Sequence, residues 1–219
     1  MPVGDLGKAG VNTAVAFRQE ATYGTYAVTT TALNPVAVTS VNFMTKFEHQ
    51  KLDELSFSRG FGRFVQLDKT VDGSVEMFLH PDEGTPWLLI NAMGGRYTFN
   101  SLTSAGDHSI SAGNLTASDT VLSLSIWVQK GDEQSFRYVG GVINKLKLSA
   151  AIGEPAKLSA ELVFQDSSIS TADTLTTSLS FSSVAPFTYV DGTFRYSSSA
   201  TAAATTTAAE EIQAFELEI

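Results

Sequence analysis

Two long segments in which apolar and polar residues alternate constrain the fold of this chain more than any other feature. They are Val38–Leu52 and Gln66–His80, and the connector Asp53–Val65 separates them. Alternation with a period of two is typical of a half-buried β-strand, because successive side chains point to opposite faces of a sheet. Two such segments on either side of a short connector predict one long β-hairpin.

The second of these segments carries acidic residues along its polar face. Asp68, Asp72 and Glu76 are four residues apart, so all three lie on one face of a strand. At about 3.3 Å per residue, neighbouring carboxylates are about 13 Å apart, which is too far for all three to bind one metal ion. The spacing therefore predicts a charged stripe along the strand and no metal site.

Alternation and turn residues predict further strands on both sides of the hairpin. These strands are Gly10–Gln19, Asp119–Lys130, Ser135–Val139, Asn144–Ile152, Ala156–Gln165, Leu179–Ser183, Phe187–Val190, Thr193–Tyr196 and Glu210–Ile219. Segments rich in Thr, Ser, Ala and Gly are predicted as loops or extended arms. They are Glu20–Pro35, Asp107–Leu115, Ser167–Ser178 and Ser197–Ala209.

A single short helix is predicted between the hairpin and the later strands. Thr85 is a suitable N-cap, Pro86 fits the first helical position, and Gly94-Gly95 ends the helix. A helix of about ten residues is marginal in isolation, so it must pack on a sheet.

The predicted fold class is mainly β: a β-sandwich or partial barrel with one short flanking α-helix and a long β-hairpin. A chain of 219 residues can form a single domain of this kind. Within a single domain 1–219 we expect an N-terminal strand and arm (1–37), the long hairpin (38–80), the short helix (81–95) and the remaining sandwich strands (96–219).

The composition narrows the possible functions. The formal net charge is −9, which disfavours binding to nucleic acid because phosphate contacts need clustered Lys and Arg. The chain has no cysteine, so a disulfide framework, a thiolate zinc site and a cysteine nucleophile are excluded. The N-terminal residues lack the apolar run of a secretory signal, and no apolar stretch is long enough for a membrane span. We therefore expect synthesis in the cytoplasm and no membrane partner.

No constellation of residues predicts catalysis. His49, His80 and His108 stand outside the sequence motifs of hydrolases and metalloenzymes. The adjacent carboxylate pairs occur at predicted turns, where they do not converge on a cleft. We expect no catalytic residue, no metal site and no cofactor, and hence no enzyme.

Aromatic and basic residues gather in the hairpin connector, and the N-terminal arm carries two tyrosines. Such a mixture could stack on single-stranded nucleic acid, but the acidic chain favours contacts with protein, where aromatic residues and Arg are enriched. The candidate inter-subunit contacts are Tyr23, Tyr26, Phe57, Arg59, Phe61, Arg63 and Phe64.

Three sequence motifs, in this order, resemble tail tube proteins of long-tailed, siphovirus-type bacteriophages. The first is Val15–Thr25 (VAFRQEATYGT), where an early strand leads into Glu-x-x-Tyr-Gly-Thr. The second is Asp72–Glu76, followed by Pro86–Leu89 and Gly94-Gly95. The third is the Tyr-x-Gly-x-x-Ile-Asn-x-Leu pattern within Phe136–Leu148.

The resemblance implies a tail-tube-like β-sandwich whose subunits form hexameric rings. Long hairpins close an inner barrel in each ring, and the rings stack into a hollow tube through which DNA leaves the capsid. The expected partners are other copies of the chain and the tape measure, tail terminator and distal tail proteins, while viral DNA passes without specific binding. The expected location is the phage tail of the virion. In such a tube, Asp68, Asp72 and Glu76 would line the lumen.

Other interpretations remain open from the sequence alone. The chain could be the inner tube of a contractile injection machine or a carbohydrate-binding β-sandwich. An enzyme is the third alternative. Members of the resembled family are often longer, so Ile219 is either the end of a short member or is followed by further strands.

Overall fold

The computed structural model describes residues 13–26, 34–52, 63–80, 85–94, 96–100, 107–111, 123–130, 134–170, 184–189 and 214–219. These residues are mainly β, as predicted. The strands are β1 (Thr13–Gln19), β2 (Asn34–Val36), β3 (Val38–Leu52), β4 (Arg63–Phe78), β5 (Arg96–Asn100), β6 (Asp107–Ser111), β7 (Leu124–Lys130), β8 (Gln134–Ala151), β9 (Lys157–Phe164), β10 (Asp166–Ser170) and β11 (Ala214–Glu218). The single helix among the described residues is α1 (Thr85–Met93).

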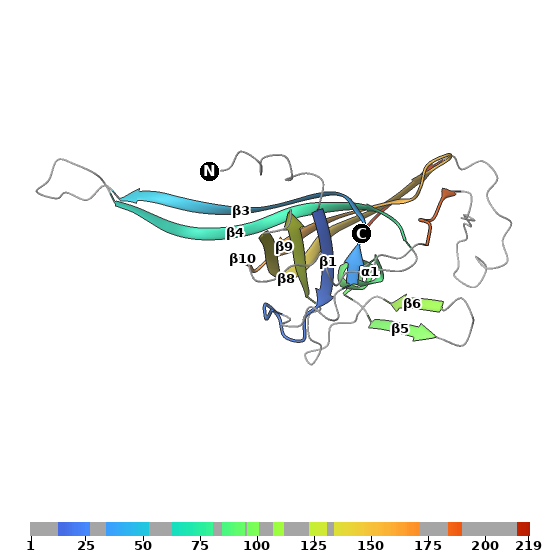
Figure 1. Cartoon of the computed structure of the whole chain (residues 1–219), viewed down its shortest axis with the longest axis horizontal. Helices are drawn as coiled ribbons and strands as arrows, with labels where there is room; N and C mark the ends of the chain where they lie inside the picture. The colour runs from blue at the N-terminus through green and yellow to red at the C-terminus, as the bar shows by residue number, and fades with distance from the viewer. Residues whose placement is uncertain are drawn as a thin grey trace, which may run out of the picture.

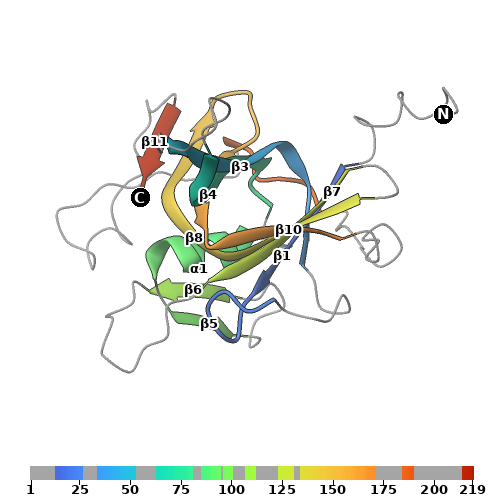
Figure 2. The ribbon, with the colours of Figure 1, turned by 90° about the vertical axis from the view of Figure 1, so that its left-hand side faces the viewer.

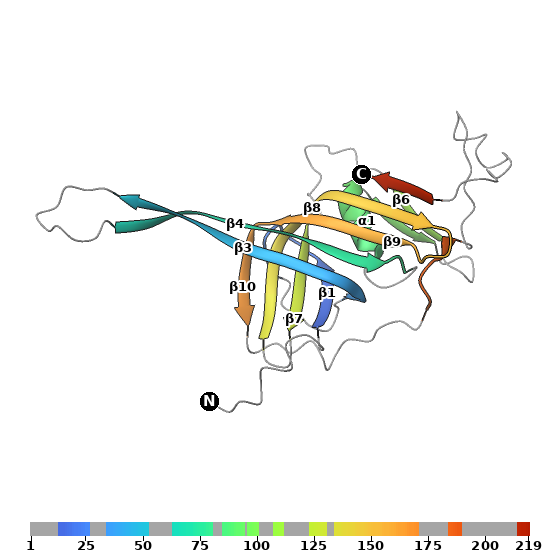
Figure 3. The same ribbon diagram turned by 90° about the horizontal axis from the view of Figure 1, so that it is seen from above.

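Two antiparallel sheets share the long strand β8. Sheet A has the order β2-β1-β7-β8-β10, and sheet B has the order β11-β8-β9-β4-β3. Seen from above, β1, β7 and β10 run across the direction of β3, β4 and β9, and β8 turns from one direction to the other (Figure 3). Figure 2 shows the same two sets of strands in a view along the hairpin. Strands that pass from one sheet to the next form the corners of such crossed packings.

The turn in β8 occurs at Gly140-Gly141, where its pairing passes from β7 to β9. Gly140 has φ +65°, and a Cβ there would lie 2.6 Å from Cβ of Gln165, the residue between β9 and β10. A Cβ on Gly141 would lie 2.8 Å from the carbonyl oxygen of Leu124. The two glycines therefore allow β8 to lie close to Gln165 on one side and to β7 on the other.

The apolar face of the predicted hairpin forms part of the core. Val71, Val75 and Met77 of β4 are at most 2% exposed. Facing residues of sheet A complete this core, among them Val15, Phe17, Ile126 and Val128. The alternation is confirmed from Val71 to Met77, where Val71, Val75 and Met77 are buried and the polar residues between them are not.

Helix α1 packs on the sheets through Leu88 and Ile90, as its length requires. The buried side chain of Asn91 also accepts a hydrogen bond from the backbone N–H of Ile143 in β8 at 2.8 Å. The helix ends before Gly94, which has φ +57°. The predicted helix and its glycine stop are confirmed, with Thr85 inside the assigned helix instead of preceding it.

The hairpin β3–β4 extends well beyond the rest of the molecule (Figure 1). The two strands pair from Val38–Met77 to Leu52–Arg63. On its other side, β4 pairs with β9 only between Val71 and Phe78. Residues 63–70 of β4 and their partners, residues 46–52 of β3, therefore form a two-stranded ribbon outside the sheet. We call this segment the ribbon.

Several short segments differ from their sequence prediction. Asp107–Ser111 was expected in a loop but forms β6, paired with β5, and His108 therefore lies on a strand. Asp166–Ser170 lies in a segment predicted as a Ser/Thr loop, but it forms β10 along β8. Both strands have few apolar residues, and backbone pairing with a neighbour stabilises them independently of alternation.

Other differences concern where strands begin and end. Asn34–Val36, at the end of the predicted arm, pairs with β1 as β2. The two strands predicted within 135–152 are one strand, because the glycine pair bends β8 without ending it. Residues 187–189 form no named strand, and Thr188 forms an isolated bridge with Pro155. The remaining predicted strands and turns within 171–183 and 190–213 lie outside the described residues.

Candidate assembly interface

Sheet B presents a polar face on the side opposite the core. Cross-strand register places Asp72 of β4 between Met44 of β3 and Val163 of β9, and Ser74 between Asn42 and Glu161. We call the outward residues of β3, β4, β9, β8 and β11 the polar face. Its charged members include Lys46, Glu48, Asp68, Asp72, Glu76, Lys145, Lys147, Glu161, Glu216 and Glu218.

The three carboxylates of the predicted stripe all lie on this polar face. Asp68 and Glu76 are exposed, and Asp72 is half-buried. Asp72 forms an ion pair with Lys46 across the strands at 2.8 Å, so the stripe is partly neutralised. Glu161, one strand away and exposed, adds an acid that the sequence analysis did not include, because only the β4–β9 register brings it near the stripe.

The other half of the polar face carries ion pairs between β8 and β11. Lys145 Nζ lies 3.0 Å from a carboxylate oxygen of Glu218, and Lys147 Nζ lies 2.9 Å from Glu216. The hydrogen bond that Lys145 donates to the Glu218 carboxylate raises the pKa of Lys145 above its usual range. These pairs join residues about 70 positions apart, so no local sequence pattern could have identified them.

A shallow groove crosses the polar face over β3, β4, β9 and β8. Its volume is about 470 Å³, and Lys46, Asp72, Asn144 and Glu161 are among its lining residues. Within the described ranges, no group of three or more potential metal ligands occurs. The groove therefore offers a charged surface.

The projecting ribbon exposes large apolar side chains. The exposed fractions are 71% for Phe64, 55% for Leu67, 51% for Phe47 and 40% for Val65. Neighbouring exposed apolar residues at the end of a long element are typical of a surface that another protein covers. The ribbon is therefore the strongest candidate for a docking surface.

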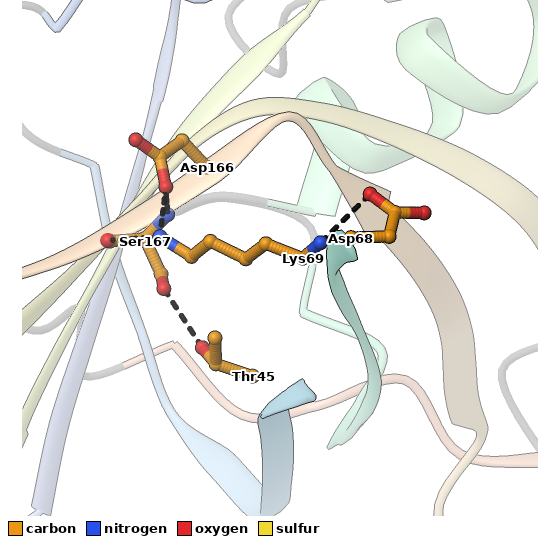
Figure 4. Close-up of polar contacts among 5 residues, drawn as sticks. All are labelled: Thr45, Asp68, Lys69, Asp166 and Ser167. Atoms are coloured by element: carbon orange, nitrogen blue, oxygen red, sulfur yellow. Dashed lines mark hydrogen bonds and ion pairs between the residues drawn. The ribbon is translucent and has the colours of Figure 1, made fainter. Parts of the chain in front are cut away.

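The ribbon leaves the sheet at a polar joint between β4 and β10 (Figure 4). Lys69 forms an ion pair with Asp166 and donates a second hydrogen bond to the carbonyl oxygen of Ser167 at 3.0 Å. The hydroxyl of Thr45 in β3 lies 2.7 Å from that of Ser167. The hydrogen bond from Lys69 lowers the pKa of Asp166 below its usual range. These contacts tie both hairpin strands to sheet A.

The candidate contact residues are only partly within the described structure. Phe64 is exposed on β4, and Arg63 begins that strand. Tyr23 is 49% exposed in the turn after β1. Phe57, Arg59 and Phe61 lie outside the described residues. Where these residues contact other subunits stays a prediction.

Tyr26 makes contacts within its own subunit. Its hydroxyl accepts a hydrogen bond from Nε1 of the buried Trp127 at 2.5 Å. The guanidinium of Arg137 lies 4.3 Å from the centre of its ring, at a distance typical of a cation–π contact. Tyr26 therefore helps to fix the turn after β1 on sheet A.

Glu20 is an important residue that the sequence analysis missed. Its carboxylate is buried and accepts hydrogen bonds from Ser123 and Ser125 hydroxyls at 2.6 Å and from Gly24 and Gly140 backbone N–H groups at 2.8 Å. It therefore joins the turn after β1 to the start of β7 and to the bend of β8. The only sequence signal was the Glu of the Glu-x-x-Tyr-Gly-Thr motif, since most partners are more than 100 residues away.

Comparison with protein families decides what kind of protein has this architecture. A family model described as phage tail tube protein matches residues 10–219. The chain belongs to the phage tail tube protein family. The predicted resemblance to tail tube proteins is confirmed. The family is structural, and a tail tube protein is a component of the phage tail.

Solved structures similar to this tail tube protein include parts of injection machines. The cap of the anti-feeding prophage, which terminates its tube, matches with 13% identity and a TM-score of 0.45, over 73% of this chain and 88% of that chain. The sheath–tube complex of an extracellular contractile injection system in its extended state matches with 8% identity and a TM-score of 0.46, over 77% and 95%. The anti-feeding prophage baseplate matches with 9% identity and a TM-score of 0.42, over 73% and 92%.

A comparison with curated protein sequences gives no match. Among the helices of the described tail tube protein, none has the length and apolar character to cross a membrane.

Proposed function

We propose that this tail tube protein assembles into hexameric rings, and that the rings stack into a hollow tube through which DNA leaves the capsid. The observation that carries this proposal is the long edge of β3. This strand has 15 residues and, among the described strands, pairs only with β4. A long unpaired edge invites pairing with another chain, and closure of a barrel removes such edges.

The edges available for ring closure differ from the sequence expectation. The sequence analysis expected the long hairpins to close the inner barrel, which would need unpaired edges on both long strands. That expectation is wrong for residues 71–78 of β4, which pair with β9. Since β4 lies inside sheet B, the whole sheet and not the hairpin alone is the unit that would form one segment of a barrel wall.

The polar face of sheet B would then form the inner surface of the tube. Glu76, Asp68 and Glu161 carry negative charge on this face, and a negative wall repels phosphate and lets DNA slide. Asp72 contributes less, because Lys46 pairs with it. Asp68, Asp72 and Glu76 are accordingly proposed lumen residues, and the opposite face of sheet B is occupied by the core.

The exposed ribbon would connect one ring to the next. Its apolar residues, Phe47, Phe64 and Leu67, lie beyond the last pairing of β4 with β9, so the core of their own subunit does not cover them. We propose that this ribbon, with Tyr23 and the connector residues, contacts a subunit of the adjacent ring. Tape measure, tail terminator and distal tail proteins are the proposed further partners, within the virion.

We also propose that residues 1–219 form a single domain. The support is that β8 belongs to both sheets and that β9 and β10 follow one another along it with only Gln165 between them. Sheet A and sheet B therefore cannot separate without breaking the bent hairpin that β8 forms with β9 and β10.

Electron microscopy of the purified protein in negative stain tests the proposed function. We expect rings with sixfold symmetry, or tubes, when the protein concentration is raised. A protein that stays monomeric at every concentration, and also in the presence of preformed tail tips, would overturn the proposal.

A further inference from the structure

The edge of β8 between Lys145 and Ala151 holds β11 in the described chain. Each strand of sheet B is antiparallel to its neighbour, in the order β11-β8-β9-β4-β3. The two outer strands of the sheet, β3 and β11, therefore run in the same direction. This follows because the described sheet has five strands, an odd number.

The direction of the outer strands has a consequence for a closed ring. Rotation about the ring axis preserves strand direction, so β3 of one subunit would meet β11 of the next in parallel. If β11 left its place, β3 would meet β8 instead, and these strands are antiparallel. Antiparallel pairing is slightly more stable per residue and would make the barrel wall uniform.

We propose that the Lys145–Ala151 edge of β8 is the docking edge for β3 of a second copy, and that β11 occupies it in the free subunit. This inference rests on the proposed ring. β11 acts as a placeholder: it satisfies the backbone groups of the edge and prevents pairing until a neighbouring subunit replaces it. Protection of one of two complementary edges is sufficient to prevent premature association.

The attachment of β11 fits a strand that can be replaced. Of the three apolar side chains on the side away from the polar face, Leu217 and Ile219 are 50% and 49% exposed and Phe215 is half-buried, so the apolar contact that holds the strand is limited. The Lys145–Glu218 and Lys147–Glu216 ion pairs are also solvent-exposed, and such pairs contribute little to stability. Besides the half-buried Phe215, the strand is held by backbone pairing, which an incoming strand can reproduce bond for bond.

The docking edge has a defined beginning. The N–H of Ile143 donates to the side chain of Asn91 from α1, so the helix occupies the edge at that residue. At the following residues the edge is open to a strand, and Leu146 exchanges both backbone hydrogen bonds with Ile219, at 2.9 and 2.8 Å. Helix α1 therefore sets where the incoming β3 would begin to pair.

A disulfide that locks β11 in place tests the inference. Leu146–Ile219 is a hydrogen-bonded pair, so Ala151–Ala214, five positions along, is a non-hydrogen-bonded pair. Side chains of such pairs are close enough for a disulfide, and the chain has no other cysteine. The variant Ala151→Cys/Ala214→Cys leaves both ion pairs intact.

We expect the oxidised variant to stay monomeric where the unmodified protein forms rings, and to form rings after reduction. The single variants Ala151→Cys and Ala214→Cys, treated with the same oxidant, serve as controls and should assemble normally. A second variant without residues 214–219 should form rings at a concentration at least several-fold lower than the unmodified protein. Circular dichroism tests whether the shortened variant folds. If the shortened variant does not fold, the comparison of the oxidised and reduced disulfide variant tests the inference by itself.

The outcomes separate the inference from the proposed function. If the oxidised variant forms rings as well as the unmodified protein, the placeholder inference is wrong and the proposed ring assembly still holds. In that case β11 stays in place and pairs in parallel with β3 of the next subunit. Failure of the unmodified protein and of the shortened variant to form rings would overturn both proposals.

Discussion

Individual residues in this protein act mainly by joining distant segments. Glu20 illustrates this, since one buried carboxylate receives hydrogen bonds from two serines and two backbone N–H groups of three separate segments. A buried carboxylate is tolerated only when hydrogen bonds or a cation satisfy it. Its partners likewise depend on it, because they would otherwise be buried without an acceptor.

Glu20→Ala should therefore destabilise the folded subunit strongly. Loss of the acceptor leaves several buried donors unsatisfied, and we expect a loss of about 3 kcal/mol or more in the free energy of unfolding, measured in urea. Glu48→Ala, which removes an exposed carboxylate on β3, is the matched control and should change stability by less than about 0.5 kcal/mol. Equal effects of the two substitutions would contradict the assigned role of Glu20.

Gly140 and Gly153 allow a similar comparison for the bend of β8. Both have positive φ, so alanine is strained at either position, at a cost of about 1 kcal/mol. At Gly153 a Cβ meets no atom within 4 Å, whereas at Gly140 it meets Gln165 at 2.6 Å. We expect Gly153→Ala to lower Tm by a few degrees and Gly140→Ala by at least twice as much. Equal shifts in thermal unfolding would show that the close approach at Gly140 is unimportant.

At the scale of elements, the hairpin is the part that the sequence specified best. Period-two alternation predicted the bounds of β3 and the buried face of β4, because half-buried strands show their two faces directly in sequence. Alternation carried no information about β6 and β10, whose residues are mostly polar. It also could not reveal that β8 continues through Gly140-Gly141, since a glycine pair resembles a turn unless the partner strands are known.

The candidate sites were predictable to the same limited degree. The stripe of Asp68, Asp72 and Glu76 follows from spacing within one strand. The pairing of Asp72 with Lys46, the nearby Glu161 and the β8–β11 ion pairs depend on strand register, which a single sequence does not give.

The joint at the base of the hairpin should depend on pH. Lys69 lowers the pKa of Asp166, so the stability from this ion pair is present at neutral pH and is lost as the pH falls through the folded-state pKa. Asp166 is 57% exposed, so we expect its contribution to be below about 1 kcal/mol. Asp166→Asn should be less stable than the unmodified protein at about pH 7 and equal to it at about pH 2. A difference that is constant with pH would exclude the ion pair as its cause.

The exposed ribbon should contribute to assembly and not to folding. Phe64→Ser removes a side chain that is 71% exposed, so the unfolding free energy should change by less than about 0.5 kcal/mol. The same substitution should shorten or abolish tubes in electron micrographs while rings still form. Gln66→Ser, on the same strand, is the control and should leave tube length unchanged. Normal tubes from Phe64→Ser would argue against a role for this residue between rings.

At the scale of the whole molecule, the two sheets have different environments in the proposed tube. Sheet B would form the wall around the lumen through its polar face, and sheet A would lie on the other side of the core. The shared strand β8 fixes the orientation of one sheet relative to the other. The side of the tube on which a residue lies can therefore be tested with single cysteines, since the natural chain has none.

Glu76→Cys in assembled tubes should be protected from a maleimide attached to a polymer too large to enter the lumen. Ser168→Cys, an exposed position on β10 of sheet A, is the control and should react in tubes as readily as in monomers. Both cysteines should react fully in the monomer. Rapid labelling of Glu76→Cys in intact tubes would place the acidic stripe outside the lumen.

The length of the β3–β4 ladder has a mechanical consequence. Its hydrogen bonds run perpendicular to the strands, from Val38–Met77 to Leu52–Arg63. Tension along the hairpin therefore loads the rungs of this ladder together, in shear, whereas a pull across its open end would break them one after another. A tube whose rings are connected by such hairpins can bend and stretch along its axis without unzipping its subunits.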